Sequence, residues 1–179
     1  TRMISFTAGL AAVLALSACT DDGQTNTGSS ASTSAQADSA LSTAAINCAP
    51  APAIPTDVPT FRATQAPPAT APDLATVRMV TNCGAITIEL NGAAAPQSVA
   101  SFLLLGEGDF WTDSPCHRLV DGGIHVLQCG DPTGTGRGGS GQNLNAEFSK
   151  EPHVRGTLSM ARSNDPNSAD SQFFIVFAR

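Results

Sequence analysis

The feature that most constrains the fold of this chain is the stretch CHRLVDGGIHVLQCGD at residues 116–131, in which two short apolar runs flank a Gly-Gly pair. The alternation along these runs predicts two β-strands joined by a turn at Gly122 and Gly123. Neighbouring strands hold their side chains rigidly, so Arg118 and Gln128 would be fixed hydrogen-bond donors. On these residues alone, a surface arginine beside a solvated amide is an equally good interpretation.

Four cysteines, Cys48, Cys83, Cys116 and Cys129, follow the first cysteine of the chain, Cys19, and allow three pairings as two disulfides. A bond between Cys116 and Cys129 is attractive because their predicted strands are neighbours. Alternation, however, places Cys116 on the face of the arginine and Cys129 on the face opposite the glutamine, so this pair needs a bulge or a twist to meet. In an exported protein we expect at least one disulfide.

Other patterns are weaker. The run GTGRGG at residues 134–139 matches the letters of a dinucleotide fingerprint, but no helix is predicted after it. The set Cys116, His117, His125 and Cys129 does not have a standard zinc spacing. The net charge of −6 argues against a nucleic-acid partner, which needs clustered lysine and arginine. We therefore expect no cofactor, no metal and no nucleic acid.

The chain divides by composition into three parts. Residues 1–18 have the apolar run of a signal peptide that is too short to span a bilayer comfortably. Leu16-Ser17-Ala18-Cys19 resembles the lipobox of bacterial lipoproteins, in which Cys19 would carry the lipid; an ordinary cleaved signal with an incidental cysteine is the alternative. Residues 19–74 are rich in Ser, Thr, Ala and Pro and predict a flexible linker. Residues 75–179 form the predicted globular domain.

Within this domain, residues 77–80 and 85–90 predict a β-hairpin around a turn at residues 81–84. Residues 95–106 predict one helix, with Pro96 in its first turn and Gly106 at its end.

Four blocks in the domain, HR, QCGDPTGTG, GTLSMA and SQFFI, occur in this order. Together they resemble cyclophilin-type peptidyl-prolyl cis–trans isomerases over about residues 75–179. The resemblance implies a mainly β fold, a closed antiparallel β-barrel capped by helices. The family domain continues for several strands and a second helix beyond Arg179, so we expect only about the N-terminal two-thirds of the barrel in this chain.

The resemblance also implies roles for particular residues. Arg118 would be catalytic, because a charged donor that hydrogen-bonds the twisted amide nitrogen stabilises the transition state. Gln128 would hold the neighbouring carbonyl of the substrate and would act together with Arg118. The proline pocket and peptide groove would be formed by His125, Val126, Ala161, Arg162, Gln172 and Phe174.

We therefore expect a monomeric prolyl isomerase, anchored by lipid on the extracytoplasmic face of the membrane, that acts on proline-containing peptides or unfolded exported proteins. The alternative is a low-activity peptide-binding or chaperone module that uses the same groove. His125 favours this alternative, because the family usually has phenylalanine at that position and an imidazole is polar.

Overall fold

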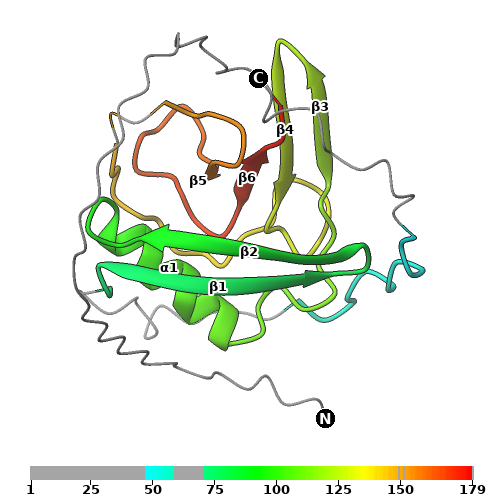
Figure 1. The fold of residues 1–179 in the computed structure, drawn as a ribbon. Helices are drawn as coiled ribbons and strands as arrows, with labels where there is room; N and C mark the ends of the chain where they lie inside the picture. Colours follow the sequence, from blue (N-terminus) through cyan, green and yellow to red (C-terminus); the bar gives the residue numbers. More distant parts are fainter. Residues whose placement is uncertain (1–46, 59–70, 149, 151, 179) are drawn as a thin grey trace, which may run out of the picture. The chain divides into compact units, whose positions relative to one another are not determined.

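The computed structural model describes residues 47–58, 71–148, 150 and 152–178, which all belong to the compact unit Ala45–Arg179. The predicted signal peptide and Cys19 lie outside the described residues. Figure 1 shows the strands and the helix that the described residues form. They are β1 (Leu74–Thr81), β2 (Gly84–Asn91), α1 (Pro96–Glu107), β3 (Arg118–Gly122), β4 (Ile124–Cys129), β5 (Leu158–Met160) and β6 (Phe173–Val176).

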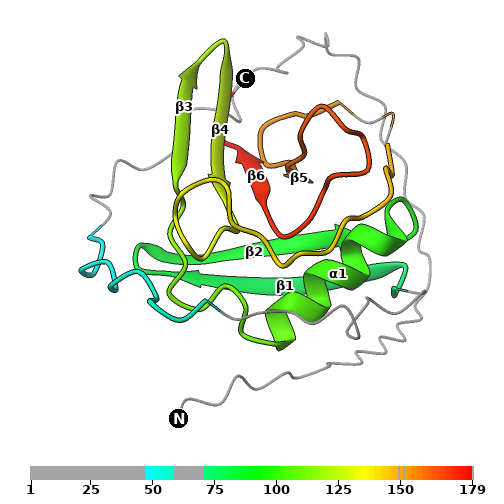
Figure 2. The same cartoon turned by 180° about the vertical axis from the view of Figure 1, so that it is seen from behind.

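Strands β1 and β2 form an antiparallel hairpin, as predicted, in which Thr81 pairs with Gly84 across the turn. Gly84 has a φ of +123°, which L side chains rarely adopt, so this turn requires glycine. Ile88 and Leu90 alternate with exposed residues on β2 and are buried. The hairpin therefore presents one apolar face, which packs against α1 (Figures 1 and 2).

The predicted helix is confirmed as α1, with Pro96 in its first turn. Its N-cap residue, Ala95, has no side-chain oxygen that could accept from the exposed amides of the first turn. Glu147 supplies that acceptor from a distant loop: its carboxylate accepts from the amides of Gln97 and Ser98, both at 2.9 Å, and from the Ser98 hydroxyl at 2.8 Å. A negative charge at a helix N-terminus also interacts favourably with the positive end of the helix dipole.

The second sheet has the order β3-β4-β6-β5, with every neighbouring pair antiparallel. The turn between β3 and β4 is centred on Gly123, the second glycine of the predicted pair, which has a φ of +75°, while Gly122 is the last residue of β3 and pairs with Ile124. Strand β6 comes from the end of the described chain and lies between β4 and β5. The two predicted strands of residues 116–131 thus become one edge of a larger sheet.

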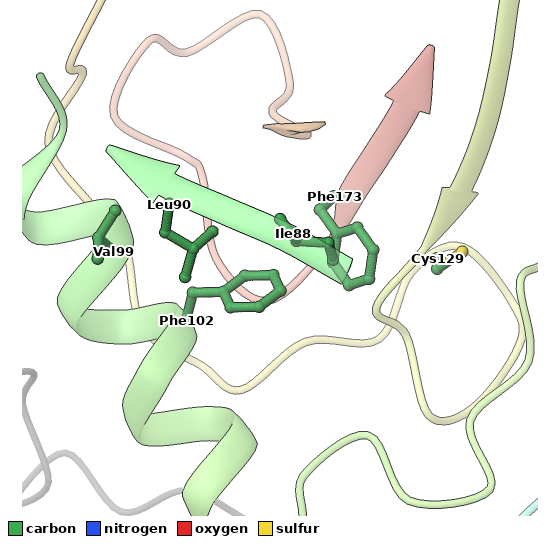
Figure 3. Packing of buried hydrophobic residues seen from close by; sticks show 6 residues of the cluster. All are labelled: Ile88, Leu90, Val99, Phe102, Cys129 and Phe173. Atoms are coloured by element: carbon green, nitrogen blue, oxygen red, sulfur yellow. The ribbon is translucent and has the colours of Figure 1, made fainter. Parts of the chain in front are cut away.

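One apolar core joins the hairpin, the helix and the second sheet (Figure 3). The rings of Phe102 on α1 and Phe173 on β6 have centroids 5.4 Å apart, and Trp111 contacts both. Edge-to-face aromatic pairs of this kind add to the energy of burial. Residues of this cluster are Ile88, Leu90, Val99, Phe102, Cys129 and Phe173.

The predicted mainly antiparallel β fold with a helix is confirmed. In the part of the chain that the structure describes, the strands divide between a two-stranded and a four-stranded sheet, and they do not close into a single barrel. None of the helices in the described ranges has the length and apolarity needed to cross a membrane.

Residues 47–58 depart from the flexible linker predicted for residues 19–74. Cys48 forms a disulfide with Cys83 in the β1–β2 turn. The amide of Ala49 donates to the carbonyl of Asn82 at 2.7 Å, and the Asn82 side chain donates back to the carbonyl of Ala49 at 2.8 Å. The composition of this segment predicted flexibility, but composition does not show which cysteines form disulfides. The covalent bond between Cys48 and Cys83 fastens the segment to the hairpin.

Candidate functional site

Arg118 and Gln128 belong to one row of cross-strand partners that runs across the whole second sheet. Arg118 pairs with Gln128, Gln128 with Phe174, and Phe174 with Ser159. The sequence neighbours of this row, such as Phe173, pack on the apolar core. Because side chains alternate between faces, the row lies on the face of the sheet away from that core.

Arg118 and Gln128 are joined to a loop by a chain of hydrogen bonds. Nη1 of Arg118 donates to Oε1 of Gln128 at 3.0 Å, and Nε2 of Gln128 donates to Oε1 of Gln172 at 2.9 Å. Nε2 of Gln172 then donates to the carbonyls of Gly136 and Gly138, at 3.1 and 2.8 Å. The chain thus connects the arginine on the edge strand to the glycine-rich loop.

The glycine-rich loop follows β4 and is drawn in yellow in Figure 1. It folds around the side chain of Asp131, which accepts hydrogen bonds from several of its residues. This carboxylate is fully buried. It accepts five hydrogen bonds, from the hydroxyls of Thr133 and Thr135 and from the amides of Thr133, Gly136 and Gly138. Gly136 has a φ of +76°, a conformation that allows its amide to turn inward towards the carboxylate.

These bonds decide the charge of Asp131. Burial opposes ionisation, but the hydrogen bonds from the Thr133 hydroxyl and from the Gly138, Thr133 and Gly136 amides outweigh it and hold the pKa of Asp131 below its usual value. The sequence predictions did not include Asp131 among the site residues. The signal that could have found it is an aspartate followed by Thr two residues later and by several glycines, a pattern typical of Asx turns.

A groove of about 540 Å³ opens beside this hydrogen-bond chain. Four of the predicted site residues line it, namely Gln128, Ala161, Arg162 and Gln172. The groove is also lined by the glycine-rich loop. Such a cleft between a rigid sheet and a loop is a typical place for a ligand.

The groove carries charges that the sequence predictions did not assign to it, from Arg137 and Asp170. The Asp170 carboxylate is occupied by neutral donors, the hydroxyl of Ser140 and the amide of Gly141. The guanidinium of Arg162 lies over the ring of Phe148, 5.5 Å from its centroid. Arginine on an aromatic face keeps its charge while part of its surface is covered.

Other predicted site residues stand in different relations to the groove. Val126 is buried in β4, on the same face as Gln128 by alternation. The ring of Phe174 lies 5.8 Å from that of His153, whose Nε2 is 3.2 Å from the Ser159 hydroxyl. The Ala161 amide donates to the carbonyl of Gln172 at 2.8 Å, so any pairing of this segment with a peptide would use its other backbone groups.

The structure does not bring His125 to this row. On β4 it alternates with Val126 and Gln128, so its side chain lies on the other face. Its Nδ1 is 2.6 Å from Oδ1 of Asp121, its cross-strand partner, and its ring lies 5.8 Å from that of Phe177.

Cys116 and Cys129 form a disulfide beside the row, with their Cα atoms 4.0 Å apart. The alternation argument assumed that β3 already includes Cys116, whereas the strand begins at Arg118. Outside the strand the chain is free of the pleat, so Cys116 can turn towards Cys129 without a bulge. The bond uses both thiols and ties together the ends of β3 and β4 that carry the arginine and the glutamine.

The comparison with known families identifies this arrangement. A family model described as cyclophilin type peptidyl-prolyl cis-trans isomerase/CLD matches residues 76–179, which is more than half of the chain. The chain therefore belongs to the cyclophilin-type peptidyl-prolyl cis–trans isomerase family.

Similar curated proteins carry corresponding names. The probable peptidyl-prolyl cis-trans isomerase B of Mycobacterium tuberculosis is 39% identical over 122 residues, an alignment that covers 60% of this chain and 39% of that protein. The peptidyl-prolyl cis-trans isomerase-like 3 of Rattus norvegicus is 39% identical over 108 residues, covering 58% of this chain and 65% of that protein. The chain thus spans less than two thirds of these relatives.

Among solved structures, a cyclophilin type peptidyl-prolyl cis-trans isomerase of Cryptosporidium parvum, crystallised in the presence of the dipeptide Ala-Pro, is 35% identical. The match has a TM-score of 0.53 and covers 58% of this chain and 68% of that chain.

Proposed function

We propose that this chain is the main part of a peptidyl-prolyl cis–trans isomerase domain, in which Arg118 is the catalytic residue. The observation that carries the proposal is the position of Arg118: Gln128 holds its guanidinium by a 3.0 Å hydrogen bond, and Gln128 itself lines the groove. Membership of the family supports the same reaction.

The chemistry requires no covalent intermediate. Rotation about an X-Pro bond has a barrier of about 18–20 kcal/mol because the C–N bond has partial double-bond character. In the twisted state the amide loses resonance and its nitrogen becomes a hydrogen-bond acceptor. A cationic donor aimed at this nitrogen stabilises the twisted state more than either planar isomer, and so lowers the barrier. Arg118 suits this role because arginine stays charged and its donors form a rigid fork.

Gln128 would serve both the arginine and the substrate in this proposal. Its Oε1 accepts from Arg118, and one N–H of its Nε2 donates to Gln172. A side-chain amide has two N–H groups, so the second remains for a substrate carbonyl. Val126 and Phe174 would provide the apolar contact with the proline ring.

For the substrate we propose proline-containing peptide segments, including unfolded exported proteins. The relative from Cryptosporidium parvum crystallised in the presence of Ala-Pro supports a peptide of this class. We further propose a monomer, held by a lipid on Cys19 at the extracytoplasmic face of the membrane. The two disulfides among the described residues support an oxidising compartment.

We also propose that the whole protein closes these strands into the barrel implied by the family, with further strands from residues after Arg179. The edges of the four-stranded sheet, β3 and β5, support this proposal, because each has a ladder neighbour on one side only in the described residues.

The test is an isomerisation assay on a short X-Pro peptide with the complete gene product and with Arg118→Ala, accompanied by a peptide-binding titration. Catalysis by the wild type that is largely lost in Arg118→Ala, with binding retained, supports the proposal. A wild-type protein that binds the peptide without turnover would contradict it and would favour a peptide-binding or chaperone module.

A further inference from the structure

We propose that Asp131 is a positioning residue for Arg118, which acts through the glycine-rich loop and the side-chain amides of Gln172 and Gln128. The proposal rests on the isomerase function proposed above, because it names a residue that prepares the same arginine. Asp131 itself is fully buried beneath its loop and does not line the groove.

The first step is the fold of the loop itself. Both oxygens of Asp131 accept hydrogen bonds: Oδ1 from the amide and hydroxyl of Thr133, at 2.8 and 2.7 Å, and Oδ2 from the amides of Gly136 and Gly138, at 2.6 and 3.1 Å. An ionised carboxylate only accepts, so it can satisfy donors on every side. An asparagine in its place would turn an NH₂ group towards donors at one of these positions.

The second step is the orientation of the Gln172 amide. With their amides held by Asp131, Gly136 and Gly138 both direct their carbonyl oxygens to Nε2 of Gln172. A carbonyl accepts but cannot donate, so this end of the glutamine must be its NH₂ group. Its Oε1 is then the end that lies towards Gln128.

The third step carries this orientation to the arginine. Because Oε1 of Gln172 can only accept, the NH₂ group of Gln128 must face it, at 2.9 Å. Oε1 of Gln128 is then directed at Arg118, whose guanidinium can only donate. Turning either amide over would place donor against donor or acceptor against acceptor, so the chain has one favourable orientation. The loop carbonyls therefore determine where Gln128 holds the guanidinium.

The experiment compares the complete protein with Asp131→Asn, Gln172→Ala and the double variant. Asp131→Asn should lower kcat by about tenfold to a hundredfold, as expected for a catalytic group that is displaced by a distant change, while the affinity for peptide stays close to that of the wild type. In the Gln172→Ala background the same substitution should have little further effect, because the relay is already broken.

Glu147→Gln is the matched control. Glu147 also holds two backbone amides with one carboxylate, but it caps α1, outside the hydrogen-bond chain from Asp131 to Arg118. This variant should lose stability without losing kcat. If Asp131→Asn does not fold, Thr133→Val replaces it, since it removes one donor to the carboxylate and leaves the carboxylate itself in place.

Two results would overturn the proposal: a folded Asp131→Asn with the kcat of the wild type, or a loss of kcat that simply adds to that of Gln172→Ala. If the wild type shows no turnover, the proposed function fails, and NMR spectroscopy then tests separately whether Asp131 positions Arg118. Asp131→Asn should then shift the side-chain amide signals of Gln128 and Gln172 and the guanidinium signals of Arg118. Unchanged signals would overturn the inference.

Discussion

Arg118 and Gln128 are directly opposed in the β3–β4 ladder, and Nη1 of the arginine donates to Oε1 of the glutamine at 3.0 Å. Opposed residues of an antiparallel pair hold their Cβ atoms about 5 Å apart, so the ladder places these two side chains within reach of each other. The glycine-rich loop then acts on the far end of Gln128 through Gln172. Arg118, on the edge strand β3, is thus held by a chain of hydrogen bonds that runs through Gln128 and Gln172 to the glycine-rich loop.

We expect Arg118→Ala to lower kcat/KM for prolyl isomerisation by about two to three orders of magnitude, or about 3–4 kcal/mol, the size of losing one charged donor aimed at a transition state. Arg118→Lys should also be poor, because a single ammonium cannot keep the same fork geometry. Isomerisation of a short X-Pro peptide, followed by NMR exchange, measures both. Near-complete activity in a folded Arg118→Ala protein would contradict the assigned role.

The variant His125→Phe tests whether His125 lies in the proline pocket, as the family resemblance predicts, or on the other face of β4, as in the structure. If His125 covered the proline ring, phenylalanine would improve peptide binding. In the structure His125 contacts Asp121 and Phe177 on the other face of β4, so we expect the binding free energy to change by no more than about 0.5 kcal/mol. Titration of both proteins with an X-Pro peptide checks this, and a clear gain in affinity would return His125 to the pocket.

Sequence reasoning predicted the parts that depend on local pattern. The two-residue period of residues 116–131 predicted the β3–β4 pair, whereas the register that opposes Arg118 to Gln128 appears only in the structure, where Gly122 pairs with Ile124 around Gly123. Proline and glycine likewise marked the beginning of α1 and the turn between β1 and β2. The hairpin and the helix therefore follow from local chemistry.

The missed features depend on contacts between residues distant in the sequence. Gln172 meets the loop carbonyls 36 and 34 residues earlier, and Glu147 caps a helix about 50 residues before it. No local period signals such pairs. The Cys48–Cys83 bond escaped prediction for the same reason, because a proline-rich composition contains no information about which residue it will contact.

The Cys116–Cys129 disulfide closes a loop of 13 residues, so its loss should lower the free energy of unfolding by about 3 kcal/mol. The activity of the folded fraction should be affected less than the stability, since the ladder still pairs Arg118 with Gln128. Urea unfolding with and without reductant, in a background in which Cys48 and Cys83 are both alanine, measures this bond alone. An identical unfolding midpoint in the two conditions would show that the bond contributes nothing.

The Cys48–Cys83 disulfide should control whether residues 47–58 stay against the hairpin. Beyond this bond, two hydrogen bonds between Ala49 and Asn82 hold this segment to the β1–β2 hairpin. We therefore expect a variant with Cys48→Ala and Cys83→Ala to be cleaved by protease within residues 47–58 while the domain stays intact. Mass spectrometry of the fragments identifies the site, and equal protection in both proteins would contradict the expectation.

The final prediction concerns the acid stability that Asp131 provides. Its pKa in the folded protein lies below its usual value of about 3.9, so the folded state favours the ionised carboxylate. This contribution to the free energy of unfolding is complete above the unfolded pKa and is lost as pH falls through the folded pKa. Wild type should therefore exceed Asp131→Asn in stability at pH 7, and the difference should shrink below about pH 4. Urea unfolding of both proteins from pH 7 to acid measures the difference, and the Glu147→Gln protein controls for general acid effects. A difference that stays constant to the lowest pH at which both proteins fold would mean that the loop does not depend on the charge of Asp131.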